Sequence, residues 1–196
     1  MARLYMFLIG CAPKGRHIEQ HDVFFGIGES VADVLPAAMA FWPEAASSFH
    51  LDAWREVSLV DGYQVEVIAA GTVVAKTNMQ LYFLNLGGYK KDEFEEFHYK
   101  MIVAAPGKNE AMKLSKQTAF FRHTGFKGAT AHIDDKFGVD VDNVYTIMDI
   151  LPLHVKQQYQ LVLTKAADDA VADKVHLGYF RPGRVEEWGV EQVVDG

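Results

Sequence analysis

The chain has 196 residues, 49% of them hydrophobic, so it is long enough to bury a core in one domain or two small ones. Its formal net charge of −7 argues against nucleic-acid binding, which normally needs a basic face. The single cysteine, Cys11, excludes an internal disulfide framework and suits a reducing compartment. Because no apolar run is long enough to span a bilayer, we expect a cytoplasmic protein without membrane contact.

The first expected element is a strand from Leu4 to Gly10, a short apolar and aromatic run that ends in glycine. With Cys11 behind it, this segment also resembles a bacterial lipoprotein cleavage box. The run is shorter than a signal sequence requires, however, and one Arg makes a thin basic region. A similar run, Leu81 to Gly87, recurs deep inside the chain, where it can only be structure. We therefore interpret both runs as buried strands.

The two runs belong to a longer internal likeness. The recurring residues are Leu4-Tyr5, Gly10, Lys14, Glu19 and His21, which return as Leu81-Tyr82, Gly87, Lys91, Glu96 and His98. The shift is 77 positions throughout (81 minus 4, 98 minus 21), with no gap. Further along, His50-Leu51-Asp52 returns as His132-Ile133-Asp134, at a shift of 82. The sequence therefore predicts a duplicated unit.

In each copy, a polar loop leads to a second strand, His21 to Ile27 or His98 to Ala104, which suits an antiparallel pair. A helix should follow. In the first copy Ser30 and Asp33 resemble a capping box, but Pro36 argues against so early a start, and we favour Asp33 as the cap. In the second copy Asn109 is the expected cap.

The remaining expected strands are Phe49 to Val57, Tyr63 to Ile68, Ala131 to Phe137, Tyr145 to Ile150, Tyr159 to Thr164 and Val175 to Phe180. The segment Ala166 to Asp173 suits one short helix between the last two. The strands from Phe49 and from Ala131 each carry a His-x-Asp motif, and Tyr145 to Ile150 is the expected counterpart of Tyr63 to Ile68.

This order of elements predicts the α+β class, with mostly antiparallel sheet and two main helices. We expect a tandem duplication of a β-β-α-β-β unit, in a pseudo-two-fold arrangement around one shared core, because each half alone would bury too little surface. The repeats span residues 1–76 and 77–152. Residues 153–196 form a C-terminal extension of strands and helix packed on the repeats.

The polar residues common to both copies are the candidates for chemistry. Residues two apart on a strand point to the same face, so Glu19 lies with His21, and His50 with Asp52. A carboxylate fixes the tautomer of a histidine and raises its basicity, which serves a general base or a metal ligand. The catalytic candidates are Glu19, His21, Asp22, His50 and Asp52. The metal-ligand candidates are His21, His50, Asp52, His98, His132 and Asp134.

The structural alternative is that these acids only satisfy the hydrogen bonds of histidines on half-buried strands, which both copies would retain alike. Two further features have similar alternatives. Gly26, Gly28 and Ser30 are candidates for an anion-binding nest before a helix, or simply for a tight turn. Cys11, near several cationic residues in sequence, is either a nucleophile or a packed thiol.

Two long segments resemble a known family: Gly-Arg-His-Ile-Glu-Gln-His-Asp-Val-Phe-Phe-Gly-Ile-Gly-Glu-Ser at residues 15–30, and His-Leu-Asp-Ala-Trp-Arg-Glu-Val at residues 50–57. They look like the uncharacterised bacterial family catalogued as domain of unknown function 1543, whose short domain occurs once or twice per chain. The resemblance extends from Leu4 to Ile150 and is looser in the second copy, where Tyr99 replaces Asp22. It implies a bacterial origin and two copies, but no activity, cofactor or catalytic residue.

Two functions remain open. The first is a binding or regulatory protein without catalysis, with a homodimer as an open alternative, in which the repeated acids and histidines are structural. The second is an enzyme or metal-binding protein with a His/Asp/Glu site in the first repeat or at the junction of the repeats. The first repeat is the better candidate because it alone keeps Asp22, the Gly-x-Gly turn and Cys11. The sequence indicates no particular cofactor or small-molecule ligand.

Overall fold

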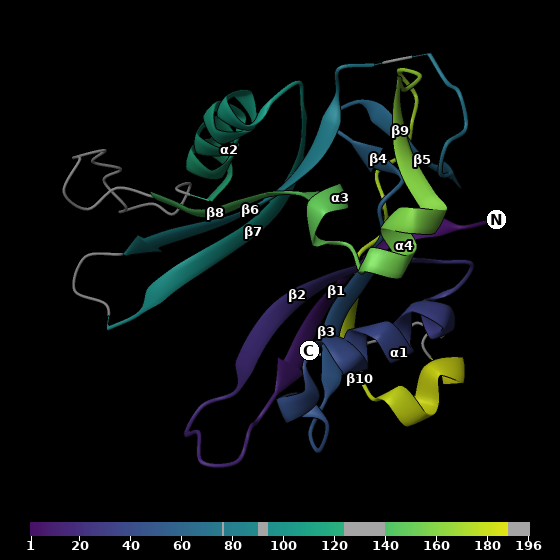
Figure 1. Cartoon of the computed structure of the whole chain (residues 1–196). Coiled ribbons are helices and arrows are strands. Elements are labelled where there is room, and N and C mark those ends of the chain that lie inside the picture. Colours follow the sequence, from purple (N-terminus) through teal and green to yellow (C-terminus); the bar gives the residue numbers. More distant parts are fainter. Residues whose placement is uncertain (76, 90–93, 124–139, 188–196) are drawn as a thin grey trace. The chain divides into compact units, whose positions relative to one another are not determined.

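The structure is a computed structural model, and it describes residues 1–75, 77–89, 94–123 and 140–187 (Figure 1). The chain forms two compact units. Unit 1 combines Met1–Val73 with Leu151–Gly196, and unit 2 is Val74–Ile150. The chain therefore leaves unit 1, builds unit 2 and returns. The expected division into 1–76, 77–152 and 153–196 concerns repeats, and it stays a prediction.

The main sheet of unit 1 has four antiparallel strands in the order β10-β3-β1-β2. These strands are β1 (Arg3–Cys11), β2 (Gln20–Gly28), β3 (His50–Glu56) and β10 (His176–Phe180). The aromatic and β-branched residues of β1 and β2 favour pleated, half-buried strands. The two strands pair without interruption from Arg3↔Gly28 to Cys11↔Gln20. The predicted antiparallel pair is confirmed.

One helix, α1 (Val31–Phe41), packs on one face of this sheet (Figure 1). Ser30, not Asp33, is its N-cap, so the predicted later start is wrong. The Ser30 backbone N–H donates to the Asp33 carboxylate at 2.8 Å, and the Asp33 N–H donates to the Ser30 hydroxyl at 3.4 Å. This reciprocal capping box fixes the first turn, so the helix forms although Pro36 lacks a donor.

The core between α1 and the sheet is apolar throughout. Its buried members are Tyr5, Phe7, Ile9, Cys11, Phe24, Val34, Leu35, Ala38, Ala45, Phe49, Leu51 and Phe180. After α1 the chain makes a short 3-10 turn, η1 (Pro43–Ala45), and then enters β3. Because alternate residues of β1 face this core, the residues between them point to the opposite face of the sheet.

Unit 1 also contains a second antiparallel sheet in the order β4-β5-β9, made of β4 (Leu59–Val60), β5 (Tyr63–Ala69) and β9 (Tyr159–Lys165). Asp61 and Gly62 link β4 to β5 with φ angles of 51° and 75°, the conformation that favours Asp-Gly in a two-residue hairpin loop. Two helical segments complete the unit, α4 (Leu153–Gln158) and η2 (Pro182–Glu187).

Unit 2 has a three-stranded antiparallel sheet in the order β7-β6-β8 and one long helix. Its elements are β6 (Gln80–Tyr89), β7 (Glu96–Ala105), α2 (Lys108–His123), β8 (Asp140–Thr146) and α3 (Ile147–Ile150). Every β1–β2 pair recurs as a β6–β7 pair at a shift of 77, from Gln80↔Ala105 to Gly88↔Phe97. The irregularity between Leu8 and Ile9 also recurs, between Asn85 and Leu86.

The two units thus share strand order and register, while descent from a duplication stays a prediction. The pseudo-two-fold arrangement and the shared core stay predictions as well. The α+β class with mostly antiparallel sheet is confirmed. Among the described residues, no helix has the length and apolar character needed to cross a bilayer.

Three predicted elements need comment. Tyr145 to Ile150 is not a strand, because β8 ends at Thr146 and α3 follows. Ala166 to Asp173 is not a helix, since the Asp173 carboxylate accepts hydrogen bonds from the Ser58 and Leu59 backbone and holds the segment in an irregular path. The predicted strand Ala131 to Phe137 lies outside the described residues.

Candidate functional site

The register of three strands brings the candidate residues of unit 1 together. Gly10 on β1 pairs with His21 on β2 and with His50 on β3, so the two histidines flank one glycine. Ile9 and Cys11 face the core under α1, so Gly10 lies on the opposite face of the sheet. Asp52 is the extra residue of a β-bulge, because Ile9 pairs with Leu51 while Leu8 pairs with Ala53.

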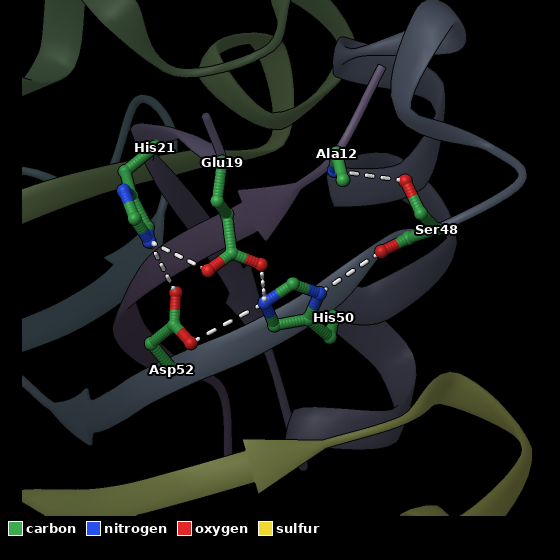
Figure 2. A network of polar contacts seen from close by, with 6 residues as sticks. All are labelled: Ala12, Glu19, His21, Ser48, His50 and Asp52. Atoms are coloured by element: carbon green, nitrogen blue, oxygen red, sulfur yellow. Dashed lines mark hydrogen bonds and ion pairs between the residues drawn. The ribbon is translucent and has the colours of Figure 1, made fainter. Parts of the chain in front are cut away.

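Glu19, His21, His50 and Asp52 form a ring of alternating imidazoles and carboxylates, which we call the His–carboxylate cluster (Figure 2). His50 Nε2 lies 2.9 Å from Glu19 Oε1 and 3.3 Å from Asp52 Oδ1. His21 Nε2 lies 3.2 Å from Asp52 Oδ2 and 3.7 Å from Glu19 Oε2. Each carboxylate therefore bridges both imidazoles.

His50 is the fixed member of the cluster. Its side chain is only 2% exposed, whereas Glu19 and His21 are 43% and 40% exposed. Its Nδ1 lies 2.9 Å from the Ser48 carbonyl oxygen, which can only accept, so Nδ1 carries a proton. The Tyr179 ring covers the imidazole at a centroid distance of 4.1 Å. Backbone and aromatic contacts thus set the orientation of this ring.

Since Nδ1 carries the proton, the neutral form of His50 has a lone pair on Nε2. That lone pair faces carboxylate oxygens of Glu19 and Asp52, an arrangement that repels unless a positive charge lies nearby. Within the described part of the chain, neither His50 Nε2 nor Asp52 Oδ2 makes a hydrogen bond of normal geometry, although both atoms are buried. His50 Nε2 is thus within ion-pair distance of both carboxylates, but no N–H is aligned between the nitrogen and an oxygen.

Gly10 provides the space in which the cluster sits. A Cβ atom at this position would overlap His50 Nε2 and would lie 2.5 Å from Asp52 Oδ2. Any larger residue would therefore displace both side chains. Gly10 was predicted only as the end of a strand, yet its lack of a side chain is a condition for the cluster.

The other candidates of the first repeat lie apart from the cluster. Asp22 is exposed, and its carboxylate accepts from the backbone of its own neighbour, Val23. Cys11 is fully buried in the core, where burial raises the pKa of its thiol, with a smaller contribution from Glu19. Because the thiolate is the reactive form, this environment argues against a nucleophile and favours the packed thiol.

The glycines of the expected anion nest serve close packing instead. A Cβ at Gly26 would overlap the Val34 side chain, and one at Gly28 would lie 2.8 Å from it, so both glycines let α1 approach β2. The Ser30 amide already donates to the Asp33 carboxylate. This geometry gives the nest no support.

In the described part of the second repeat, the structure records contacts for His98 and its neighbours. His98 lies 3.8 Å from Glu96 and 3.3 Å from the Asn85 side chain. The register position of His50 is taken by Asp140, which pairs with Gly87 as His50 pairs with Gly10. The remaining metal-ligand candidates, His132 and Asp134, lie outside the described residues.

Sequence reasoning missed three contributors: Gly10, Ser48 and Tyr179. Gly10 was visible as a glycine shared by both copies at 10 and 87, which could have marked a close approach. Ser48 acts through its carbonyl, and its hydroxyl accepts from the Ala12 backbone N–H at 3.0 Å. No residue pattern indicates that the carbonyl of Ser48 will bind a side chain. Tyr179 is more than a hundred residues from His50 in the chain, so no local pattern links the two.

The fold and the site together define an α+β protein with a His–carboxylate cluster on the face of an antiparallel sheet. Residues 16–67, which include all four members of the cluster, match the family described as Domain of Unknown Function (DUF1543). No curated protein matches the chain. The fold is similar to that of protein Il1583 from Idiomarina loihiensis, known from a crystal structure, with a TM-score of 0.60 and 22% sequence identity. That similarity covers 92% of this chain and 97% of the other.

Proposed function

We propose that the protein is a binding protein whose ligand enters the His–carboxylate cluster and supplies a positive charge there. The observation that carries this proposal is the position of His50. Its Nδ1 is committed to the Ser48 carbonyl, and its buried Nε2 faces two carboxylates without an aligned hydrogen bond. A cation placed between these groups would remove the repulsion and satisfy both acids.

A purely structural role would leave a different pattern. In the large majority of cases a buried histidine that only completes the packing has its ring nitrogens in aligned hydrogen bonds. Here three members of the cluster remain partly exposed, with Asp52 at 27%, so solvent and solutes reach them. With neutral imidazoles the two carboxylates give the cluster two negative charges, which favours cationic over anionic ligands.

The second candidate function is general-base catalysis. It is favoured by His21, whose Nε2 lies 3.2 Å from Asp52 and whose side chain is 40% exposed, because a general base must be held by a partner and reachable by a substrate. A base alone does not define a reaction, so this candidate ranks second. We keep the expectation of a bacterial, cytoplasmic protein that binds no nucleic acid. The homodimer stays a prediction.

The test is thermal unfolding of the untagged protein at pH 8 with a panel of solutes. The panel contains divalent metal ions, arginine, spermidine and inorganic phosphate. A ligand present at about 100 times its Kd stabilises the folded state by about 2.7 kcal/mol, and the melting temperature rises accordingly. We expect at least one cation, and not phosphate, to raise it.

The variants His21→Gln and Asp52→Asn should abolish that rise. Asp22→Asn is the matched control, because Asp22 is adjacent in sequence to His21 but exposed and outside the cluster. It should keep the full response. If no cation stabilises the wild type, and the two cluster variants merely melt earlier, the cluster is structural and the proposal fails.

A further inference from the structure

The chemistry of the cluster restricts the ligand further. Resting on the proposed function, we infer that the ligand is a divalent first-row transition-metal ion, with Zn²⁺ as the simplest probe. The His–carboxylate cluster offers two imidazole nitrogens and two carboxylates. Imidazole ligands suit Zn, Cu, Ni and Fe, whereas Mg²⁺ and Ca²⁺ prefer oxygen ligands only.

The environment of His50 is the one that metal-binding histidines need. Such a residue commonly donates its second ring N–H to a carbonyl or a carboxylate, which fixes the tautomer and leaves the other nitrogen free for the metal. The Ser48 carbonyl occupies this place, 2.9 Å from Nδ1. The Tyr179 ring and the bare backbone of Gly10 hold the imidazole in position without adding a competing polar group.

Taken one pair at a time, the donor atoms are already about as far apart as two ligands of one ion. Ligand bonds of about 2.1 Å in a tetrahedral site place neighbouring donors roughly 3.4 Å apart. The four nitrogen–oxygen separations of the cluster range from 2.9 to 3.7 Å. Two negative charges from Glu19 and Asp52 would balance the charge of a divalent ion, so its burial beside His50 leaves no excess charge.

Binding requires a local movement. As they stand, no three His, Cys, Asp or Glu side chains among the described residues are gathered closely enough to hold an ion. Each carboxylate instead spans the two imidazoles with separate oxygens (Figure 2). Glu19 and His21 are each about two-fifths exposed, so their side chains can turn inward while His50 and Asp52 stay in place.

The experiment measures Zn²⁺ binding to the full-length protein by titration calorimetry and by metal analysis after dialysis. We expect one ion per chain, no response to Mg²⁺, and visible absorption bands when Co²⁺ replaces Zn²⁺. His21→Gln should weaken binding at least about 100-fold, since it removes a ligand and not only an outer partner. His50→Gln should weaken Zn²⁺ binding to a similar extent. If this variant does not fold, His21→Gln alone decides the matter, because His21 is exposed.

The matched control is His17→Gln, because His17 lies exposed in the loop between β1 and β2 and belongs to no part of the cluster. It should bind Zn²⁺ like the wild type. Absence of Zn²⁺ binding, or binding that survives both His21→Gln and His50→Gln, overturns the metal assignment. If arginine or spermidine stabilises the wild type but not His21→Gln while Zn²⁺ does not bind, the proposed function stands and only this inference fails.

Discussion

A substitution at Gly10 tests ligand binding by the cluster separately from the stability of the fold. The residue lies under His50 and Asp52 and pairs with both histidine-bearing strands. We predict that Gly10→Ala abolishes the cation response, because the added methyl group would displace His50 Nε2 and Asp52 Oδ2. Overpacking of this kind costs about 1–3 kcal/mol, so the variant should still fold. Urea unfolding and ligand titration together measure the two effects.

Gly183→Ala is the control for this prediction, since nothing lies within 4 Å of a Cβ at Gly183, which belongs to unit 1 but not to the cluster. It should leave ligand affinity and the urea midpoint near those of the wild type. Ligand affinity that is unchanged in Gly10→Ala would show that the space above Gly10 has no part in binding.

At the scale of elements, β10 is the edge strand that completes the sheet around β3. His176 on this strand stacks on Trp54 of β3, with ring centroids 3.9 Å apart and an interplanar angle of 2°. Burial lowers the pKa of His176, and nearby Lys174 lowers it further. The stacked imidazole is therefore neutral at physiological pH.

This shift predicts a pH dependence of stability. Because the folded pKa lies below the unfolded value of about 6.5, the unfolded chain takes up a proton first as the pH falls. The contribution of His176 is thus present above about pH 6.5 and is lost as the pH falls below that value. Urea unfolding between pH 7.5 and 5 should show a smaller loss in His176→Gln than in the wild type.

His17→Gln is the matched control for this prediction, since His17 lies exposed in the loop between β1 and β2. It should keep the acid destabilisation of the wild type. Identical slopes of stability against pH in His176→Gln and in the wild type would show that the stacked pair has no role in the acid response.

At the scale of the whole molecule, unit 2 is inserted between two paired strands of unit 1. The strands are β5 and β9, which pair from Tyr63↔Lys165 to Ala69↔Tyr159, and the Ala70 N–H donates to the Gln158 carbonyl at 2.8 Å. The outgoing and returning chains are thus joined by hydrogen bonds next to the insertion. All members of the His–carboxylate cluster belong to unit 1.

We predict that unit 1 folds and keeps its ligand when residues 74–150 are replaced by a short Gly/Ser linker. Unit 1 has its own apolar core and a size within the ordinary range of domains. Circular dichroism, thermal unfolding and ligand titration test this. An excised chain that does not fold would instead support the expectation that the two units share one core.

Some strands could be predicted from the sequence and others could not, according to the kind of interaction that fixes each one. The strands from Leu4 and from Leu81 and their partners were predictable, because apolar alternation and an uninterrupted likeness specify both period and register. The start of β8 was not, because the residue that pairs with Gly87, as His50 pairs with Gly10, is Asp140, which no sequence likeness to His50 marks. The predicted strand that carries His132 and Asp134 lies outside the described residues and stays a prediction.

The site was predictable to a similar degree. The alternation of strand residues predicted two pairs, Glu19 with His21 and His50 with Asp52. The pairing of β1 with both β2 and β3 brings the two pairs together. The orientation of His50 was not predictable, since it depends on a backbone carbonyl at Ser48 and on a ring at Tyr179. That orientation is what distinguishes a ligand site from a set of ion pairs.

The most informative single measurement is therefore the position of the His50 protons, given by long-range ¹H–¹⁵N NMR of the imidazoles at pH 8 without added ligand. We expect a proton on Nδ1, where it meets the Ser48 carbonyl, and none on Nε2, which lies beside Glu19 and Asp52. A proton on Nε2, whether alone or together with one on Nδ1, would contradict this expectation. The cluster would then be a self-satisfied network of hydrogen bonds and ion pairs with no need of a ligand.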